Sequence, residues 1–344
     1  MISPVRPINW QTDPMQDLNG DFTQNTLLNN AHVLYRQSIK APEDVVVSPD
    51  GKVYTGLANG DIVRIDISRM DMSLSDRKQN DITSAEIIAN TNGRPLGLKF
   101  DKRGNLIIAD ALKGLIKLSP NGNITVLASQ FEGQDMLLVD YVDIAKSGDI
   151  YFSDASTRFK LETHLLDFIE ASSTGRILKY SADTKQVSLV VDNLFFANGL
   201  ALGPNDEYMI IAETGRARLL KHYLKGSKSG ETEVFIDSLP AMPDNISYNG
   251  KDKFWVGLVT MRDWRIESLS EWPVVRRIIG AFPTKMFAPT DGYGFVISVN
   301  TQGEVVNNLQ TPAKYTLITS AVEHDGKLIM GSLTNSGIAV YDLP

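Results

Sequence analysis

Short segments in which apolar and polar residues alternate run through almost the whole chain, and turns rich in Gly, Asn and Asp separate them. Alternation with a period of two is typical of β-strands with one buried face. The order strand, turn, strand, turn, strand recurs at residues 43–66, 95–128, 139–156 with 175–191, 198–224, 244–260 with 294–309, and 320–343. Six copies of one such unit predict an all-β fold, a six-bladed β-propeller. Two β-sandwiches are the alternative, which we favour less because no linker or change in composition divides the chain.

The sixth copy ends after three strands, so we expect an early segment to complete its blade. Residues 31–38, AHVLYRQS, contain residues typical of strands and precede the first copy. If they pair with the last strand, the ring closes without a free sheet edge. We therefore predict a propeller over residues 31–344 and a polar N-terminal tether over residues 1–30.

Two segments interrupt the repeat after the second strand of a copy. Residues 158–173 have apolar side chains at helical spacing, and residues 261–289 carry Trp264, Trp272, Ile278, Ile279 and Phe282. We expect both to be helical insertions over the top face. They could be surface helices packed on the propeller, or a lid over the central channel that also touches a membrane or a hydrophobic substrate.

Composition narrows the classes of function. The chain has 344 residues, 22% of them charged, and a formal net charge of −7, which argues against a nucleic-acid partner. It contains no Cys and only four His without metal-binding spacing, so thiolate chemistry is excluded and a His-rich metal site is not expected. No apolar run is long enough to span a membrane, so we expect a soluble chain and leave its compartment open.

Acids and amides recur where the predicted inner strands begin. These positions are Glu43 with Asp44, Asp140, Asn198, and Asp244 with Asn245. In a propeller the first residues of the inner strands gather around one end of the axis, and carboxylate and amide oxygens suit Ca²⁺, with other divalent cations less natural. Each residue taken alone is more typical of a turn, and only the coincidence across four copies favours a metal site. Asp110, Asp154 and Glu213 end second strands, and we interpret them as acceptors that stabilise turns.

The motifs GRPLGLKF (93–100), IYFSDAST (150–157), FANGLAL (196–202), MPDNIS (242–247) and EHDGKLIMGSL (323–333) resemble the strictosidine synthase-like family. More remotely the chain is similar to gluconolactonases, senescence marker proteins and paraoxonases, all six-bladed propellers. The resemblance covers about residues 40–344. Members with an N-terminal membrane anchor also exist, and SPVRP (3–7) resembles the segment after one, so the natural form could be membrane-anchored or periplasmic.

Among the calcium-dependent hydrolases of this superfamily, the resemblance implies a metal held by Glu43, Asp140, Asn198, Asp244 and Asn245. The family motif VND reads VDY here, so Asp140 stands for an Asn and Tyr141 for an Asp, which speaks against a second calcium. The paraoxonase His corresponds to Leu96, so a His-assisted mechanism is not expected. The catalytic Glu of strictosidine synthases proper corresponds to Glu323.

These observations lead us to expect a calcium-dependent hydrolase of carboxylic esters or lactones, of arylesterase or lactonase type. Asp244 would accept the proton of the attacking water, and Glu323 is a second acid/base candidate. The apolar insertions favour a hydrophobic or aromatic substrate. The alternatives are a condensing enzyme that uses Glu323 and a non-enzymatic binding propeller with structural calcium. The absence of a G-x-S-x-G motif and of a Gly-rich phosphate loop disfavours a serine hydrolase and a nucleotide enzyme.

Overall fold

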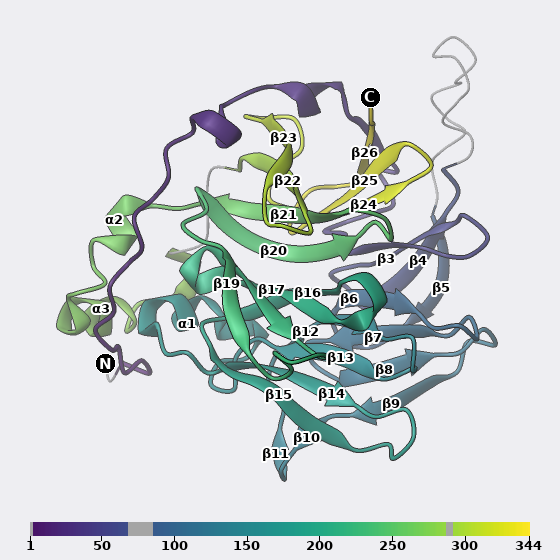
Figure 1. Ribbon diagram of the computed structural model, residues 1–344, viewed down its shortest axis with the longest axis horizontal. Helices are drawn as coiled ribbons and strands as arrows, with labels where there is room; N and C mark the ends of the chain where they lie inside the picture. Colours follow the sequence, from purple (N-terminus) through teal and green to yellow (C-terminus); the bar gives the residue numbers. More distant parts are fainter. Residues whose placement is uncertain (1–2, 68–84, 287–291) are drawn as a thin grey trace.

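The computed structural model describes residues 3–67, 85–286 and 292–344, and it confirms the six-bladed β-propeller (Figure 1). Every blade is a four-stranded antiparallel sheet, and in blades one to five the strands follow chain order from the inner to the outer edge. Blade one contains β2 (Val45–Val47), β3 (Val53–Gly56), β4 (Asp61–Ile65) and β5 (Glu86–Asn90). Blade two contains β6 (Pro95–Phe100), β7 (Leu106–Asp110), β8 (Gly114–Leu118) and β9 (Ile124–Ala128). A small hairpin of β10 (Gln130–Phe131) and β11 (Gln134–Asp135) leads to blade three.

Blades three to five repeat the same order. Blade three contains β12 (Val139–Ile144), β13 (Ile150–Asp154), β14 (Gly175–Tyr180) and β15 (Val187–Leu194). Blade four contains β16 (Ala197–Leu202), β17 (Tyr208–Glu213), β18 (Arg218–Tyr223) and β19 (Thr232–Ile236), with 3₁₀ turns at η5 (Pro204–Asp206) and η6 (Thr214–Arg216). Blade five contains β20 (Ala241–Tyr248), β21 (Lys253–Met261), β22 (Gly294–Asn300) and β23 (Val305–Thr311).

The N-terminal strand closes the ring, as the sequence predicted. Blade six has three late strands, β24 (Ile318–His324), β25 (Lys327–Ser332) and β26 (Ile338–Asp342), and its outer strand is β1 (His32–Leu34). β1 pairs antiparallel with β26, with His32 opposite Val340. The inner strands then contact one another in sequence, and β24 contacts β2 to complete the circle.

The second strands are buried on both faces because each blade is sandwiched between two others. In β17 all six residues are buried, and in β7 all five are. The largest fully buried side chain, Trp255 of β21, lies in a cluster that joins blades five and six. Packing between neighbouring blades therefore holds the inner strands, and the residues at their starts, in fixed positions.

Both insertions leave the propeller at the end where the inner strands begin. The last residue of β13, Asp154, is opposite Val139 at the start of β12, and Met261 of β21 is opposite Ala241 at the start of β20. The first insertion forms η4 (Leu161–Thr163) and α1 (Leu165–Glu170). The second forms α2 (Trp264–Glu267), α3 (Pro273–Ile279) and η7 (Thr284–Met286), and its predicted residues 287–289 lie outside the described ranges. α1 contacts α3, and the helices gather on one side of the propeller in Figure 1.

The N-terminal segment, for which we expected a tether, lies against these insertions. Val5 is fully buried and packs with Phe159 and Leu166. The ring of Trp10 meets that of Phe195 edge-on, with centroids 5.6 Å apart. Beyond Trp10 the segment continues through η1 (Gly20–Phe22) and η2 (Leu27–Asn30) to β1. Within the ranges that the structure describes, no helix is long and apolar enough to cross a membrane.

Candidate metal centre

The polar residues at the starts of the inner strands lie where the strand pairing is irregular. In β12 the pairing register shifts between Val139 and Val142, around Asp140, and in β16 it shifts between Ala197 and Leu200, around Asn198. In β20 the shift spans Pro243 to Ile246 and thus Asp244 and Asn245. A bulge changes the direction in which a side chain points. We call the end of the channel formed by these positions the channel mouth.

Glycine allows the starts of neighbouring inner strands to approach one another closely. A Cβ atom on Gly199 would lie 2.5 Å from both the Cα atom of Asn245 and the carbonyl oxygen of Asp244. A Cβ atom on Gly97 would lie 2.6 Å from the Cα atom of Tyr141. Real Cβ atoms do not come this close to backbone, so any larger residue would push the strand starts apart. The glycine of the NG pair therefore helps to bring Asn198 next to Asp244.

The acids that end second strands fix the turns leading into the inner strands, as predicted. The Oδ1 atom of Asp110 accepts from the backbone N–H of Arg94 at 3.0 Å. The backbone N–H of Leu138 donates to Asp154 at 3.2 Å, and that of Phe195 donates to Glu213 at 2.9 Å. These three blades thus use one device, in which a buried carboxylate orients the backbone before the channel mouth.

The metal-ligand candidates are all buried, and several of their oxygens have no hydrogen-bond partner among the described residues. Glu43, Asp140, Asn198, Asp244 and Asn245 are at most 6% exposed. The Oδ1 atoms of Asn198, Asp244 and Asn245 are the unpartnered oxygens. A buried polar atom without a partner costs about 1–3 kcal/mol, so three in one place indicate a ligand that supplies the missing interaction.

Electrostatics also favour a cation at the channel mouth. Burial raises the pKa of Asp140 well above its usual range, and the nearby Glu43 carboxylate raises it further. Burial likewise raises the pKa of Asp244, repulsion from Glu43 and Asp140 adds to the rise, and a hydrogen bond from the Asn198 side chain opposes it. The three carboxylates therefore repel one another in a medium that solvates charge poorly.

Arg94 is a member of this centre that sequence reasoning missed. Its side chain is buried, its Nη2 atom lies 3.1 Å from the Oε2 atom of Glu43, and its Nη1 atom donates to the carbonyl oxygen of Ala41 at 3.2 Å. Arg94 also opposes the rise in the pKa of Asp140. With all three carboxylates ionised, one guanidinium would leave two negative charges at the mouth, which a divalent cation would neutralise. In the sequence, GRPLG shows an Arg immediately before the second inner strand, but not which residue that Arg contacts.

The donor set fits Ca²⁺ only when the amides are included. In the described parts of the chain, no three His, Cys, Asp or Glu side chains come together closely enough to hold a metal by themselves. The unpartnered amide oxygens of Asn198 and Asn245 would therefore have to supply further ligands. A mixed set of carboxylate and amide oxygens matches the preference of Ca²⁺, and these residues fit that ion.

The structure does not bring Glu323 to the channel mouth. Thr319, near the start of β24, donates a hydrogen bond to the carbonyl oxygen of Glu43, whereas Glu323 lies four residues further along the strand. At about 3.3 Å per residue the separation along β24 is roughly 13 Å. The Oε2 atom of Glu323 instead accepts from Trp255 at 2.7 Å and from Asn249 at 3.3 Å. Glu323 cannot serve as an acid or base for a substrate held at the mouth.

Deeper in the channel the chain provides its own cation. The Nζ atom of Lys99 lies 2.8 Å from the Oδ1 atom of Asp143. Burial lowers the pKa of Lys99, but the carboxylates of Asp143 and Asp44 outweigh this effect and leave a net rise. Tyr141, which stands for an Asp of the family motif, is buried beside this pair. A lysine ammonium thus pairs with the Asp143 carboxylate at this depth of the channel, with Asp44 nearby.

The fold and the site together define a propeller in which carboxylate and amide oxygens lie at one end of the channel. Comparison with known proteins then identifies the family. A strictosidine synthase profile matches residues 140–227, and a profile for the N-terminal part of strictosidine synthase-like proteins matches residues 20–65. Strictosidine synthase-like protein 3 of Arabidopsis thaliana is 32% identical over 350 residues, covering 96% of this chain and 90% of that protein. The chain belongs to the strictosidine synthase-like family.

An animal relative and two solved structures complete the comparison. The adipocyte plasma membrane-associated protein of Rattus norvegicus is 30% identical over 362 residues, covering 99% of this chain and 93% of that protein. A gluconolactonase from Xanthomonas campestris superposes with a TM-score of 0.65 at 11% identity, covering 91% of this chain and 90% of that one. Regucalcin from Agrobacterium tumefaciens, described as calcium-binding, superposes with a TM-score of 0.62 at 13% identity, covering 91% of this chain and 93% of that one. Because these identities are low, the two solved structures show only that the fold is shared.

Proposed function

We propose that the chain is a calcium-dependent hydrolase of carboxylic esters or lactones. The observation that carries this proposal is the group of buried, unpartnered oxygens of Asn198, Asp244 and Asn245 beside mutually repelling carboxylates. Glu43, Asp140, Asn198, Asp244 and Asn245 would hold the cation. When bound, Ca²⁺ would polarise the substrate carbonyl and stabilise the oxyanion that forms from it. Gluconolactonase activity in a protein of the same fold is consistent with the proposal.

Asp244 is the residue that we assign to proton transfer. Its carboxylate is buried, one of its oxygens has no hydrogen-bond partner within the described ranges, and the other candidate acid, Glu323, lies elsewhere. A carboxylate beside the reacting carbonyl can accept a proton from an attacking water. The same carboxyl group then returns the proton to the alcohol oxygen that leaves the acyl carbon. The carboxylate is thereby regenerated, whether the alcohol departs, as with an ester, or stays attached, as with a lactone.

The surroundings of the channel mouth favour an apolar substrate. Leu96, at the mouth in blade two, belongs to an apolar cluster with Phe195 and Phe196 that extends to Leu161 and Phe168 of the first insertion. This cluster would exclude water and accommodate a hydrophobic or aromatic acyl or alcohol group. Because the candidate ligands are at most 6% exposed, we expect α1 and the N-terminal segment to move when substrate enters. A surface cavity of about 580 Å³ lined by residues 127–132 and 185–189 lies away from the mouth.

A panel of aryl esters and lactones, assayed with EDTA and after Ca²⁺ is restored, tests the proposal. We expect the wild type to turn over substrate, EDTA to abolish this activity and Ca²⁺ to restore it. The conservative substitution Asp244→Asn should remove the activity. Asp110→Asn is the matched control, because Asp110 is equally buried but holds a turn. Calcium-dependent stability without turnover of any substrate would instead identify a binding propeller with structural calcium. Turnover that is indifferent to EDTA would exclude the proposed chemistry.

A further inference from the structure

The second insertion presents an unusual number of apolar side chains to solvent. Its exposed residues are Trp264, Ile266, Trp272, Val274, Ile278 and Phe282, each between 48% and 72% exposed. We call these six side chains the α2–α3 surface. They include two of the four Trp residues of the chain. Scattered exposed apolar residues are normal, but a concentration on two short helices indicates an interaction site.

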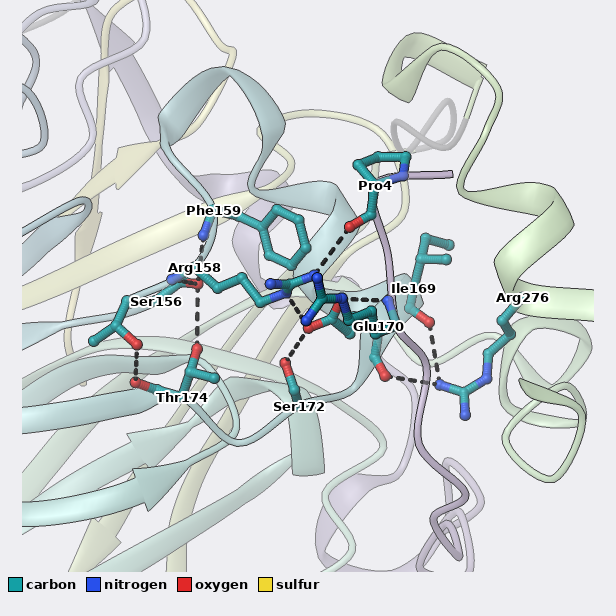
Figure 2. Close-up of polar contacts among 11 residues, drawn as sticks. Pro4, Ser156, Arg158, Phe159, Ile169, Glu170, Ser172, Thr174 and Arg276 are labelled. Carbon is teal, nitrogen blue, oxygen red and sulfur yellow. Dashed lines mark hydrogen bonds and ion pairs between the residues drawn. The ribbon is translucent and has the colours of Figure 1, made fainter. Parts of the chain in front are cut away.

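Helix α3 exposes apolar side chains and buries one of its two arginines, while the other, Arg277, is exposed. Arg276 is only 3% exposed, whereas Val274 and Ile278, two residues before and after it on the opposite side, are 72% and 60% exposed. The Arg276 guanidinium donates to the carbonyl oxygens of Ile169 at 3.1 Å and Glu170 at 3.3 Å, as Figure 2 shows. A helix on a water-soluble protein normally buries its apolar face and exposes its cations. An outer side that combines Val274 and Ile278 with the exposed Arg277 suits a helix at the boundary between water and an apolar medium.

Buried cations also fix α2. Arg262, just before this helix, has a side chain that is 2% exposed and forms an ion pair with Glu267 at 2.6 Å. It donates further hydrogen bonds to the carbonyl oxygens of Asp13 at 2.6 Å and Leu239 at 3.3 Å. The insertion is thus attached by polar contacts and by the packing of Ile279 against the Val5 cluster, and the six side chains of the α2–α3 surface stay outside.

Charge and helix length indicate what covers this surface. Residues 261–282 contain four Arg and three acids, so the segment is slightly cationic although the whole chain has a net charge of −7. Trp combined with Arg and aliphatic side chains is typical of the boundary between lipid headgroups and acyl chains. With four and seven residues, α2 and α3 are too short to cross a bilayer and suit a position within its interface.

We propose that the α2–α3 surface docks the propeller on a lipid bilayer, with its apolar side chains inserted at the headgroup boundary. Both insertions extend from the end of the propeller that carries the channel mouth. Docking would therefore turn the mouth toward the membrane. The proposal does not depend on calcium binding or on hydrolysis.

Flotation of the full chain with phosphatidylcholine vesicles tests this inference. We expect the wild type to float, and the exposed-residue variant Trp264→Ser/Trp272→Ser/Ile278→Ser to bind about a hundredfold more weakly. The matched control Val126→Ser/Leu189→Ser removes two apolar side chains that are 55% and 46% exposed elsewhere, and it should float like the wild type. Vesicles of brominated phosphatidylcholine should quench tryptophan fluorescence in the wild type more than in the triple variant.

Three results would overturn the inference. The first is no flotation of the wild type, and the second is flotation of the triple variant at wild-type strength. The third is a dimer, seen by light scattering, that the triple substitution disrupts while no vesicles are bound, since the surface would then join two copies of the chain. Asp244→Asn should float normally, which separates this inference from the proposed hydrolase.

Discussion

Replacing Asp244 with asparagine should have opposite effects on stability in the absence and in the presence of calcium. Without the metal, Asp244 is a buried carboxylate next to Glu43 and Asp140, and burial and repulsion raise its pKa. Asparagine is nearly isosteric and uncharged, so we expect the metal-free variant to gain about 1–4 kcal/mol. For 344 residues at about 2.1 cal/mol/K each, this corresponds to a rise in Tm of about 1–6 °C.

With calcium the order should reverse. A ligand at one hundred times its Kd stabilises the native state by about 2.7 kcal/mol. The same entropy of unfolding converts this into a rise of about 4 °C for the wild type. Asp244→Asn should lose this response because a proposed ligand oxygen has been replaced by an amide that cannot neutralise the ion.

Differential scanning calorimetry of both proteins, in EDTA and in excess Ca²⁺, measures these shifts. The control Asp110→Asn should have a lower Tm in both conditions, because Asp110 accepts three backbone hydrogen bonds, but should keep the full calcium response. If Asp244→Asn lowers the Tm without calcium and shows the wild-type response to the ion, Asp244 is a turn residue and the reasoning fails.

Three further predictions concern residues around the channel mouth. Arg94→Met should destabilise the metal-free protein by about 3–5 kcal/mol, because Glu43 loses its buried counterion. In thermal melts, calcium should recover part of this loss, and unchanged stability would contradict the prediction. Gly199→Ala should lower the free energy of unfolding by about 1–3 kcal/mol, since the new Cβ atom would clash with the backbone of Asn245. It should also weaken calcium binding measured by calorimetry, and an unchanged affinity would refute the packing argument. Burial raises the pKa of Asp167 to about 7, so the unfolding free energy should fall by about 4 kcal/mol as the pH rises from 4 to 8. Asp167→Asn should remove this fall in denaturant titrations at the two pH values, and retention of it would refute the assignment.

The sign of the pH effect follows from the surroundings of Asp167. Its side chain is fully buried, and neither carboxylate oxygen has hydrogen-bond geometry to another described residue, although Ser156 is close enough to lower the pKa slightly. The folded state therefore holds the proton up to a higher pH than the unfolded chain does. The resulting stability is present at low pH and is lost as the pH rises through the folded pKa.

The fold could be predicted from the sequence because each blade repeats the same local signals. Alternating strands, Gly and Asn turns and an unfinished last blade determined the number of blades and the closing strand. The same repeat aligned Asp140, Asn198 and Asp244 at the starts of inner strands, and the structure places all three at one channel mouth, within reach of each other's charges or hydrogen bonds.

Other features could not be predicted because they depend on distances between blades. Arg94 precedes an apolar strand, and nothing in its own segment shows that it reaches Glu43 in the preceding blade. Glu323 occupies a family position at the end of a strand, and only the register of β24 shows how far it lies from the mouth. The N-terminal segment reads as polar, yet Val5 is buried by helices that follow it by more than 150 residues.

Isothermal titration of the chelator-treated protein with CaCl₂ is the decisive test of a calcium centre at the channel mouth. We predict one bound Ca²⁺ per chain in the wild type and in Asp110→Asn, and none in Asp244→Asn. Absence of binding to the wild type, or binding that Asp244→Asn leaves intact, would contradict a calcium centre at the channel mouth.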